Sequence, residues 1–598
     1  MATQPSHDTS LGVTEQYDPF TIEIIQNALQ AICDEMFVAM RKTAMSAIIY
    51  EVLDMGTAIV DPKGNLASAG AGIPLFVAGL DKAVLFMIRK CEAEGIEIEP
   101  GDVFVTNDPY NGGVTHLNDV AFLMPVFVDG EIVAWTADIA HWNDVGGMVP
   151  GSMAPTATEI FQEGLRLPGV KIMAGGTPNE PLIEVMKINS RMPDFLEGDL
   201  WAGIAAVRVG ARRLEGVVRK YGAPIFGEAI ERYLDYGERM TREALKTLPK
   251  GRFTYREEQD SGLVYGCTIE IRDDTFIVDV RDNPREPGPY NISRDASLLA
   301  AQLLLKAVSD PRPICNGGNF RPLEFFTKKG AVFDPDEPAA HGVYYETVLR
   351  LYDLLWRCLA THLPEMLPAG HHASMCATVL GGIHPDTGRP YTIVEPQLGG
   401  WGGHPAGDGS SAVFSGFHGL TFNCPAEINE ARNGLFVDRL ELNPDPGGEG
   451  RERGGKGIRA DYRVRAADGF LTCFYTRSRF PPWGLAGGRD GSPNYVEIRR
   501  TDGSVERHAE VTNFALQQGD VVRIVTGNGG GYGDPKERPH EAVADDIRNG
   551  YLSESRAREV YGYAAPQGQT DTPRRPGGAP LELQPASRPL SSVAFSSG

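Results

Sequence analysis

The sequence predicts a mixed α and β, multidomain protein that matches no simple superfold. Its 598 residues are enough for about three to five domains of ordinary size. Stretches with apolar residues at three- and four-residue spacing are followed by stretches of alternating, strand-like pattern. The 70 glycines and 43 prolines follow no G-X-Y period, so they indicate many tight turns.

Composition and patterning divide the chain into five predicted segments. Residues 1–17 are expected to be a disordered lead, and the proline-rich residues 563–598 a disordered tail. Between them we expect an α/β region (18–250), a β-rich and helical middle region (251–369), and a glycine-rich β region ending in a helix pair (370–562).

In the first region, an apolar stripe predicts a helix from Asp18 to about residue 40, with Asp18 or Thr21 as its N-cap. The stripe consists of Ile22, Ile25, Leu29, Ile32, Met36 and Met40. The pattern predicts a strand–turn–strand at 57–66, strands at 102–106, 120–128 and 132–140, and helices at 77–95, 181–191, 200–220 and 226–247. Asp129-Gly130 is typical of a hairpin turn, so it should join the second and third of those strands.

The later regions are predicted in less detail. Residues 251–283 alternate as strands do, and helices are expected at 293–308 and 345–363. Short apolar runs among glycines favour β-structure and long loops from 370 to about 530. A last helix pair is predicted at 540–549 and 553–561, with Ser553 as an N-cap.

Charge and composition exclude several classes of function. Lys and Arg number 57 against 79 Asp and Glu, a net charge of −22 without a basic block, so nucleic acid is not an expected partner. No stretch of about 18 apolar residues is present, and the polar start lacks the apolar core of a secretory signal. The eight scattered cysteines form no CxxC motif and are expected to be reduced. These features predict a cytoplasmic protein with no membrane partner.

The densest polar cluster is 106–119, between two predicted strands, and it contains His116 and Asp119. His141 follows one predicted hairpin later, and a hairpin returns the chain to its starting edge, so His141 should lie beside His116. Two imidazoles and a carboxylate suit a divalent ion such as Zn²⁺ or Mn²⁺. Asp54, which precedes a predicted strand, is a candidate fourth ligand.

Each of these features also has a simpler interpretation. The HxxD spacing is common, a lone histidine is more often a loop hydrogen-bonder, and Asp108 and Asp119 could make Asx-turns or caps. The glycine-rich runs at 399–409 and 527–534 carry no P-loop Lys-Ser/Thr and do not open a helix in a βαβ unit. Tight turns and close backbone packing are therefore favoured over a nucleotide site.

Taken together, the motifs resemble the hydantoinase B/oxoprolinase family, which includes the acetone and acetophenone carboxylases. The resemblance runs from about residue 18 to 562. The segments that carry it are 50–66 (YEVLDMGTAIVDPKGNL), 107–120 (NDPYNGGVTHLNDV), 140–171, 399–409 (GGWGGHPAGDG), 423–430 (NCPAEINE), 441–457 and 527–562.

The resemblance implies a metal bound by His116, Asp119 and His141, joined in some lactam-hydrolysing members by Asp54. Zn²⁺, Mn²⁺ and Fe²⁺ all accept this ligand set. The resemblance also implies a partner, a larger hydantoinase A-type ATPase subunit that binds ATP and phosphorylates a carbonyl or enol oxygen of a small-molecule substrate. The working enzyme would then be a hetero-oligomer.

Two reactions are implied for this chain. The first is hydrolysis of a carbonyl-phosphorylated cyclic amide, as in ATP-dependent hydantoinases and 5-oxoprolinases. The alternative is ketone carboxylation, which joins a phosphoenol to CO₂. The acetone carboxylase subunit is longer than this chain, which favours the amidase or a shorter ketone carboxylase of the acetophenone type. Asp108 and Asp144 are candidate general bases from their position alone. A non-enzymatic scaffold for the ATPase is a third hypothesis.

Overall fold

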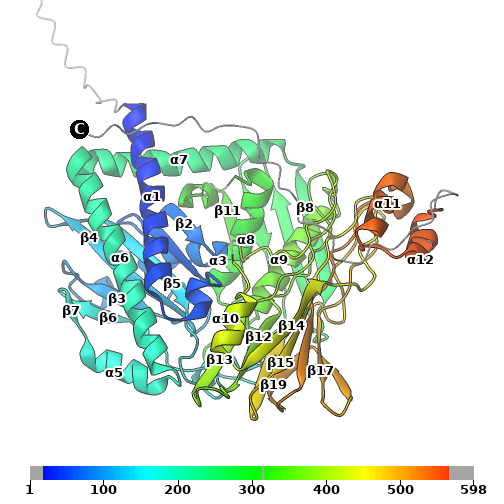
Figure 1. Ribbon diagram of the computed structural model, residues 1–598. Coiled ribbons are helices and arrows are strands. Elements are labelled where there is room, and N and C mark those ends of the chain that lie inside the picture. Colours follow the sequence, from blue (N-terminus) through cyan, green and yellow to red (C-terminus); the bar gives the residue numbers. More distant parts are fainter. Residues whose placement is uncertain (1–17, 313–314, 420, 565–598) are drawn as a thin grey trace, which may run out of the picture.

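A computed structural model describes residues 18–312, 315–419 and 421–564 (Figure 1). Within these residues the fold is mixed α and β, as predicted, and contains β-sheets of seven, four, four and five strands. The predicted lead at 1–17 and the tail from 565 onward lie outside the described residues. The largest hydrophobic cluster extends from Ile22 to Tyr532, so it joins all three predicted regions.

The N-terminal region is built on a seven-stranded antiparallel sheet of order β2-β1-β5-β4-β3-β6-β7. The strands predicted from sequence are present, and β6 and β7 were not predicted. Pro168-Gly169 at the start of β6 and the glycine pair at 175–176 interrupt any alternating pattern there. The strands are β1 (Met55–Val60), β2 (Leu66–Gly72), β3 (Val103–Thr106), β4 (Asp119–Val128), β5 (Glu131–His141), β6 (Pro168–Ala174) and β7 (Thr177–Pro178).

Helices α1 and α6 pack together against this sheet (Figure 1). The side chain of Asp18 accepts a hydrogen bond from the amide of Phe20, so α1 begins at its predicted cap. A Cβ on Gly203 of α6 would lie 2.5 Å from the ring of Phe122, so glycine permits the close approach. The predicted helix at 77–95 corresponds to α4, and the short helix α3, which was not predicted, precedes it and ends at Val77. The helices are α1 (Pro19–Thr43), α2 (Ala47–Tyr50), α3 (Pro74–Val77), α4 (Leu80–Glu94), α5 (Glu180–Asn189), α6 (Pro193–Tyr221) and α7 (Ala223–Thr247).

The middle region places two helices beside a four-stranded sheet of order β11-β10-β9-β8. Helix α9 lies at the centre of the molecule (Figure 1), and nearly all of its side chains are buried. The elements are β8 (Gly251–Glu258), β9 (Val264–Ile271), β10 (Phe276–Asp279), α8 (Arg294–Ser309), β11 (Leu323–Phe326) and α9 (Tyr344–Ala360).

The C-terminal region contains two further sheets, of order β13-β12-β16-β19 and β14-β15-β20-β17-β18. Helix α10 was not predicted, but the final helix pair was, and Ser553 caps it by accepting from the amide of Arg556. The elements are β12 (Ala377–Ile383), β13 (Pro390–Glu395), α10 (Ala426–Arg432), β14 (Leu435–Leu442), β15 (Ile458–Val464), β16 (Gly469–Phe474), β17 (Tyr495–Arg499), β18 (Val505–His508), β19 (Glu510–Leu516), β20 (Val521–Val525), α11 (His540–Arg548) and α12 (Glu554–Arg556). None of the described helices has both the length and the apolar character needed to cross a membrane.

The glycine-rich segments pack main chain against main chain. The amide of Gly400 donates to the carbonyl of Gly527 at 2.9 Å, and the amide of Gly529 donates to that of Gly455 at 2.9 Å. A Cβ on Gly529 would lie 2.1 Å from the carbonyl oxygen of Trp401. The runs at 399–409 and 527–534 therefore serve close backbone packing, the interpretation favoured from sequence.

Replacing Gly529 with alanine is expected to lower the free energy of unfolding by about 1–3 kcal/mol, because the added methyl group must displace backbone atoms. The thermal unfolding midpoint measures this. Gly216→Ala is the matched control, because Gly216 is an exposed helical residue with open space around its Cβ position; there alanine should stabilise slightly. Equal midpoints for the two variants would contradict the packing argument.

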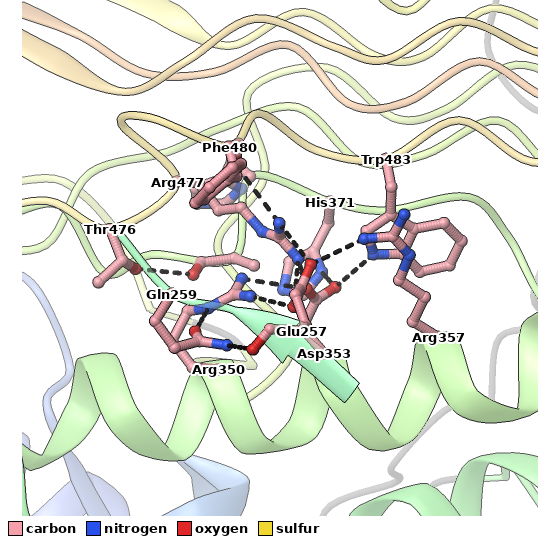
Figure 2. Close-up of polar contacts among 12 residues, drawn as sticks. Glu257, Gln259, Arg350, Asp353, Arg357, His371, Thr476, Arg477, Phe480 and Trp483 are labelled. Atoms are coloured by element: carbon pink, nitrogen blue, oxygen red, sulfur yellow. Dashed lines mark hydrogen bonds and ion pairs between the residues drawn. The ribbon is translucent and has the colours of Figure 1, made fainter. Parts of the chain in front are cut away.

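A buried ion network joins the middle and C-terminal regions (Figure 2). Glu257 of β8 accepts from Arg350 of α9 at 2.6 Å, from Arg357 at 2.7 Å and from Arg477 at 3.0 Å. Asp353 of α9 accepts from Arg350 at 3.1 Å and is also bonded to Arg477. The guanidinium of Arg477, which follows β16, therefore bridges two acids from the middle region.

Two aromatic side chains complete the surroundings of Asp353. The indole of Trp483 donates to Asp353 at 3.1 Å, and Nδ1 of His371 lies 3.9 Å from the same carboxylate. Burial alone would raise the pKa of Asp353, but the charges of Arg477 and Arg350 hold it well below its usual value. The acid is therefore ionised, and its charge is balanced by arginines from both sides of the junction.

Candidate metal centre

The predicted histidines and aspartates lie where β4 begins and β5 ends. Asp119 and His141 are direct partners across the β4–β5 ladder. Asp138 of β5 and Phe122 of β4 lie against Gly203 of α6. Because side chains alternate along a strand, Asp119 and His141, each three residues away, point to the opposite face of the sheet.

His116, Asp119 and His141 form a buried cluster whose potential ligand atoms lie within 4.8 Å of one another. The two imidazole rings are 5.2 Å apart between centroids, and Nε2 of His116 lies 3.2 Å from Oδ1 of Asp119. The hairpin therefore brings His141 beside His116, as the sequence predicted.

The inner atoms of this cluster have no hydrogen-bond partner among the described residues, namely Nε2 of His116, Oδ1 of Asp119 and Nδ1 of His141. The outer atoms do have partners. Nδ1 of His116 lies 3.2 Å from the carbonyl oxygen of Gly342, and the hydroxyl of Thr115 donates to Oδ2 of Asp119. A proton on Nδ1 of His116 leaves a lone pair on Nε2, the usual arrangement for a metal-binding histidine. Unpaired buried polar atoms are costly, so the residues fit a divalent ion.

Electrostatics favour the protonation states that bind metal. Burial, and then the neighbouring His116, lower the pKa of His141 to about 3. Burial would raise the pKa of Asp119, but the neighbouring His116 and His141 and the bond from Thr115 hold it below its usual value. His141 is therefore a neutral imidazole and Asp119 a carboxylate, the forms that act as ligands.

Asp54 borders this cluster without belonging to the group within 4.8 Å. It precedes β1, and its main-chain oxygen accepts from the amide of His141 at 3.0 Å. The carboxyl is buried, and its Oδ1 has no partner among the described residues. Burial, and then the charge of Asp119, raise the pKa of Asp54 well above its usual value. Its role as a fourth ligand stays a prediction.

Asp108 and Asp144 are buried in neighbouring loops, and both carboxylates have partners. Asp108 accepts from the amide of Tyr110 at 3.0 Å and from Arg166 at 3.0 Å. Asp144 accepts from the amides of Gly146 and Gly151 at 2.9 and 3.0 Å, and from Arg191 at 3.0 Å. These contacts hold the loops in shape, and the proposed general-base role of either acid stays a prediction.

Residues from the distant 341–345 segment complete the site and were not predicted. The ring of Tyr344 lies 4.7 Å from that of His116, and the Gly342 carbonyl that meets His116 is 226 residues away in sequence. Glu163 holds this segment by accepting from the amides of His341 and Gly342. Burial raises the pKa of Glu163 to about 8. Glu163 lies within the motif at 140–171, but no local pattern marks Tyr344.

Comparison with known proteins identifies the family. The sequence model of the hydantoinase B/oxoprolinase family matches residues 18–535. The chain belongs to this family. The resemblance stated from sequence motifs is thereby confirmed.

Members of the family include a caprolactamase subunit beta from Pseudomonas jessenii, which is 30% identical over 91% of this chain and 96% of its own length. The solved structure of the ATP-dependent caprolactamase of that organism superposes with a TM-score of 0.85 and 29% identity, over 93% of this chain and 98% of that one. Acetone carboxylase, in its nucleotide-free structure, shares the fold with a TM-score of 0.82 at 21% identity, over 91% of this chain and 80% of that one.

Proposed function

We propose that this chain is the metal-bearing subunit of an ATP-dependent cyclic amidase. The observation that carries the proposal is the buried cluster of His116, Asp119 and His141. Its inner atoms lack hydrogen-bond partners among the described residues, whereas Nδ1 of His116 and Oδ2 of Asp119, on the outside, have them. The family includes ATP-dependent hydantoinase, oxoprolinase and caprolactamase enzymes, and the caprolactamase subunit beta resembles this chain over nearly its whole length.

In this proposal His116, Asp119 and His141 hold Zn²⁺, Mn²⁺ or Fe²⁺, with Asp54 beside them. A bound divalent ion lowers the pKa of a coordinated water, so that hydroxide is available at neutral pH. The chain itself holds the ligands in place. The hydroxyl of Thr115 donates a hydrogen bond to Asp119, and the carbonyl of Gly342 lies within hydrogen-bond distance of Nδ1 of His116. Asp108 and Asp144, the candidate general bases, are paired with Arg166 and Arg191 respectively.

The partner in this proposal is a hydantoinase A-type ATPase subunit. An unactivated cyclic amide is a poor electrophile because attack destroys amide resonance. Phosphorylation of the carbonyl oxygen by the partner, at the expense of ATP, produces a reactive imidate. This chain would then add water to it, which breaks the ring C–N bond and releases the amine, the carboxylate and inorganic phosphate. The description of relatives as subunits supports a hetero-oligomer.

Ketone carboxylation is the second candidate, because the fold is shared with acetone carboxylase. The two candidates are separated by an ATPase and product assay on the chain co-expressed with an ATPase partner. Hydantoin, 5-oxoproline and acetophenone are offered in turn, with and without bicarbonate. We expect a cyclic amide to be opened without bicarbonate. Turnover of the ketone alone, and only with bicarbonate, would replace the amidase proposal by the carboxylase.

Exposed apolar side chains beside the loop after His141 suit the docking of that ATPase subunit. Met148, Phe161 and Ile188 are 49%, 69% and 83% exposed. The amide of Met148 donates to the carbonyl of Gln162 at 2.8 Å, next to Phe161. The site for Cβ on Gly146 lies 2.6 Å from the carbonyl of Asn189, next to Ile188. The main chain next to Phe161 and next to Ile188 thus contacts the segment that continues from a metal ligand, where a substrate delivered by the partner would arrive.

The double variant Phe161→Ser, Ile188→Ser is therefore expected to weaken the complex by at least about tenfold, since buried aromatic and aliphatic anchors dominate interface energies. Co-purification and titration calorimetry with the partner measure this. Val505→Ser on β18 is the control, because Val505 is also exposed but lies on the outer strand of another sheet. Equal affinities for the two variants would place the interface elsewhere.

A further inference from the structure

A cavity of about 580 Å³ lies between the 444–456 segment and the C-terminal helix pair. This is within the range of small-molecule pockets, which is about 300–1,000 Å³. The helix pair, α11 and α12, lies at one end of the molecule, well away from β4 and β5 (Figure 1). The cavity is therefore separate from the candidate metal centre.

The cavity wall carries balanced charge, with three cationic and three acidic side chains. They are Arg453, Lys456 and Arg556, and Glu449, Asp546 and Glu559. Most of them are paired. Arg453 donates to Asp546 at 3.0 Å, and Arg556 bonds to Glu449 at 2.6 Å and to Glu559 at 3.1 Å.

Two buried groups of opposite charge remain incompletely paired. Lys456 is 7% exposed, and its ammonium, with three donors, makes one hydrogen bond, to the carbonyl of Asp445 at 3.1 Å. Glu449 is 5% exposed, and its Oε2 has no partner among the described residues. Burial lowers the pKa of Lys456 by more than the nearby charge of Glu449 raises it. In the described part of the chain no ion pair joins these two residues.

We propose that this cavity binds a small amino-carboxylate zwitterion, whose carboxylate meets Lys456 and whose ammonium meets Oε2 of Glu449. A ligand with a single charge would complete the pairing of only one of the two groups and leave the other buried and incompletely paired, which is costly. A zwitterion satisfies both groups and keeps the neutral charge balance of the wall. The hydroxyls of Ser553 and Ser555 also line the cavity and offer further hydrogen bonds.

The relation between this ligand class and the reaction of the enzyme rests on the proposed function. Opening a lactam leaves an amine and a carboxylate on one chain, so the zwitterion belongs to the product class of the proposed reaction. Binding at the helix pair would then report product concentration at a site remote from the metal. The binding itself is measured without turnover, so it can succeed or fail independently of the amidase proposal.

The test is titration calorimetry of the full chain with three probes of equal length: 6-aminohexanoate, hexanoate and hexylamine. We expect 6-aminohexanoate to bind at least about tenfold more tightly than either singly charged probe, because each end adds a charge-assisted hydrogen bond. Equal affinity for the three probes, or no binding of 6-aminohexanoate, would overturn the proposal. This comparison uses the unmodified chain, so it does not depend on the folding of a variant.

Variants locate the site. Lys456→Met and Glu449→Gln should each remove the preference for 6-aminohexanoate, while Lys536→Met, at an exposed lysine nearby, should keep it. His116→Ala should also keep it. Binding that survives Lys456→Met and is lost in His116→Ala would assign the ligand to the metal centre and overturn the proposal.

Discussion

Replacing His141 with alanine is expected to abolish stoichiometric metal binding and to lower turnover of the assembled enzyme by more than about hundredfold. Loss of an outer partner of a metal ligand already costs about 10- to 100-fold, and His141 is one of three clustered ligands. Metal content per chain, measured by mass spectrometry, and activity with the ATPase partner are the two readouts. His540→Ala, at an exposed histidine, is the control and should change neither.

A graded variant refines this result. Thr115→Val removes the hydroxyl that donates to Oδ2 of Asp119 and leaves all three ligands in place. We expect it to weaken metal binding by about 10- to 100-fold. If His141→Ala lost the metal but kept turnover in an intact complex, the ion would be architectural and the proposed hydrolytic role would be wrong.

Replacing Arg477 with methionine is expected to lower the free energy of unfolding by about 3–5 kcal/mol. The variant removes the cation that bridges Asp353 and Glu257, and an uncompensated buried charge is strongly destabilising. Chemical or thermal denaturation of the full chain measures the loss.

Arg479→Met is a closely matched control for that experiment. Arg479 lies two residues later and pairs with Glu258, but both side chains are exposed. Exposed ion pairs contribute about 0–1 kcal/mol, so this variant should be nearly as stable as the unmodified chain. Similar losses for Arg477→Met and Arg479→Met would mean that the buried network does not stabilise the junction.

Local contacts made the centre of the site predictable from sequence. A single hairpin turn places His141 opposite Asp119, and periodicity is enough to find β4, β5 and the turn between them. The same local signals located α1, through its apolar stripe and the Asp18 cap. Asp54 was proposed as a ligand because it precedes a predicted strand, and the structure shows that this strand, β1, pairs with β5.

Contacts between distant segments were not predictable, because no periodicity records them. The Gly342 carbonyl that orients His116 is 226 residues away, and the Arg477–Glu257 pair spans 220. Strand β6 was missed because it begins with Pro-Gly, and helix α10 because it is one short element within long loops. In each case tertiary contacts, rather than local preference, determine the structure.

The main-chain contacts among the glycine-rich segments also determine when this region can fold. The hydroxyl of Thr526 donates to the carbonyl of Leu398, which is 128 residues away, and the adjacent Gly527 meets Gly400. A contact between segments so far apart in sequence closes a large loop. The entropy cost of closing the loop comes before the contact energy is gained, which slows folding. During synthesis, residues 399–409 must therefore wait until residues 527–531 have left the ribosome. Until then the main-chain groups that pair across the two segments, such as the amides of Gly400 and Gly403, stay open to water, and to chaperones or other nascent chains.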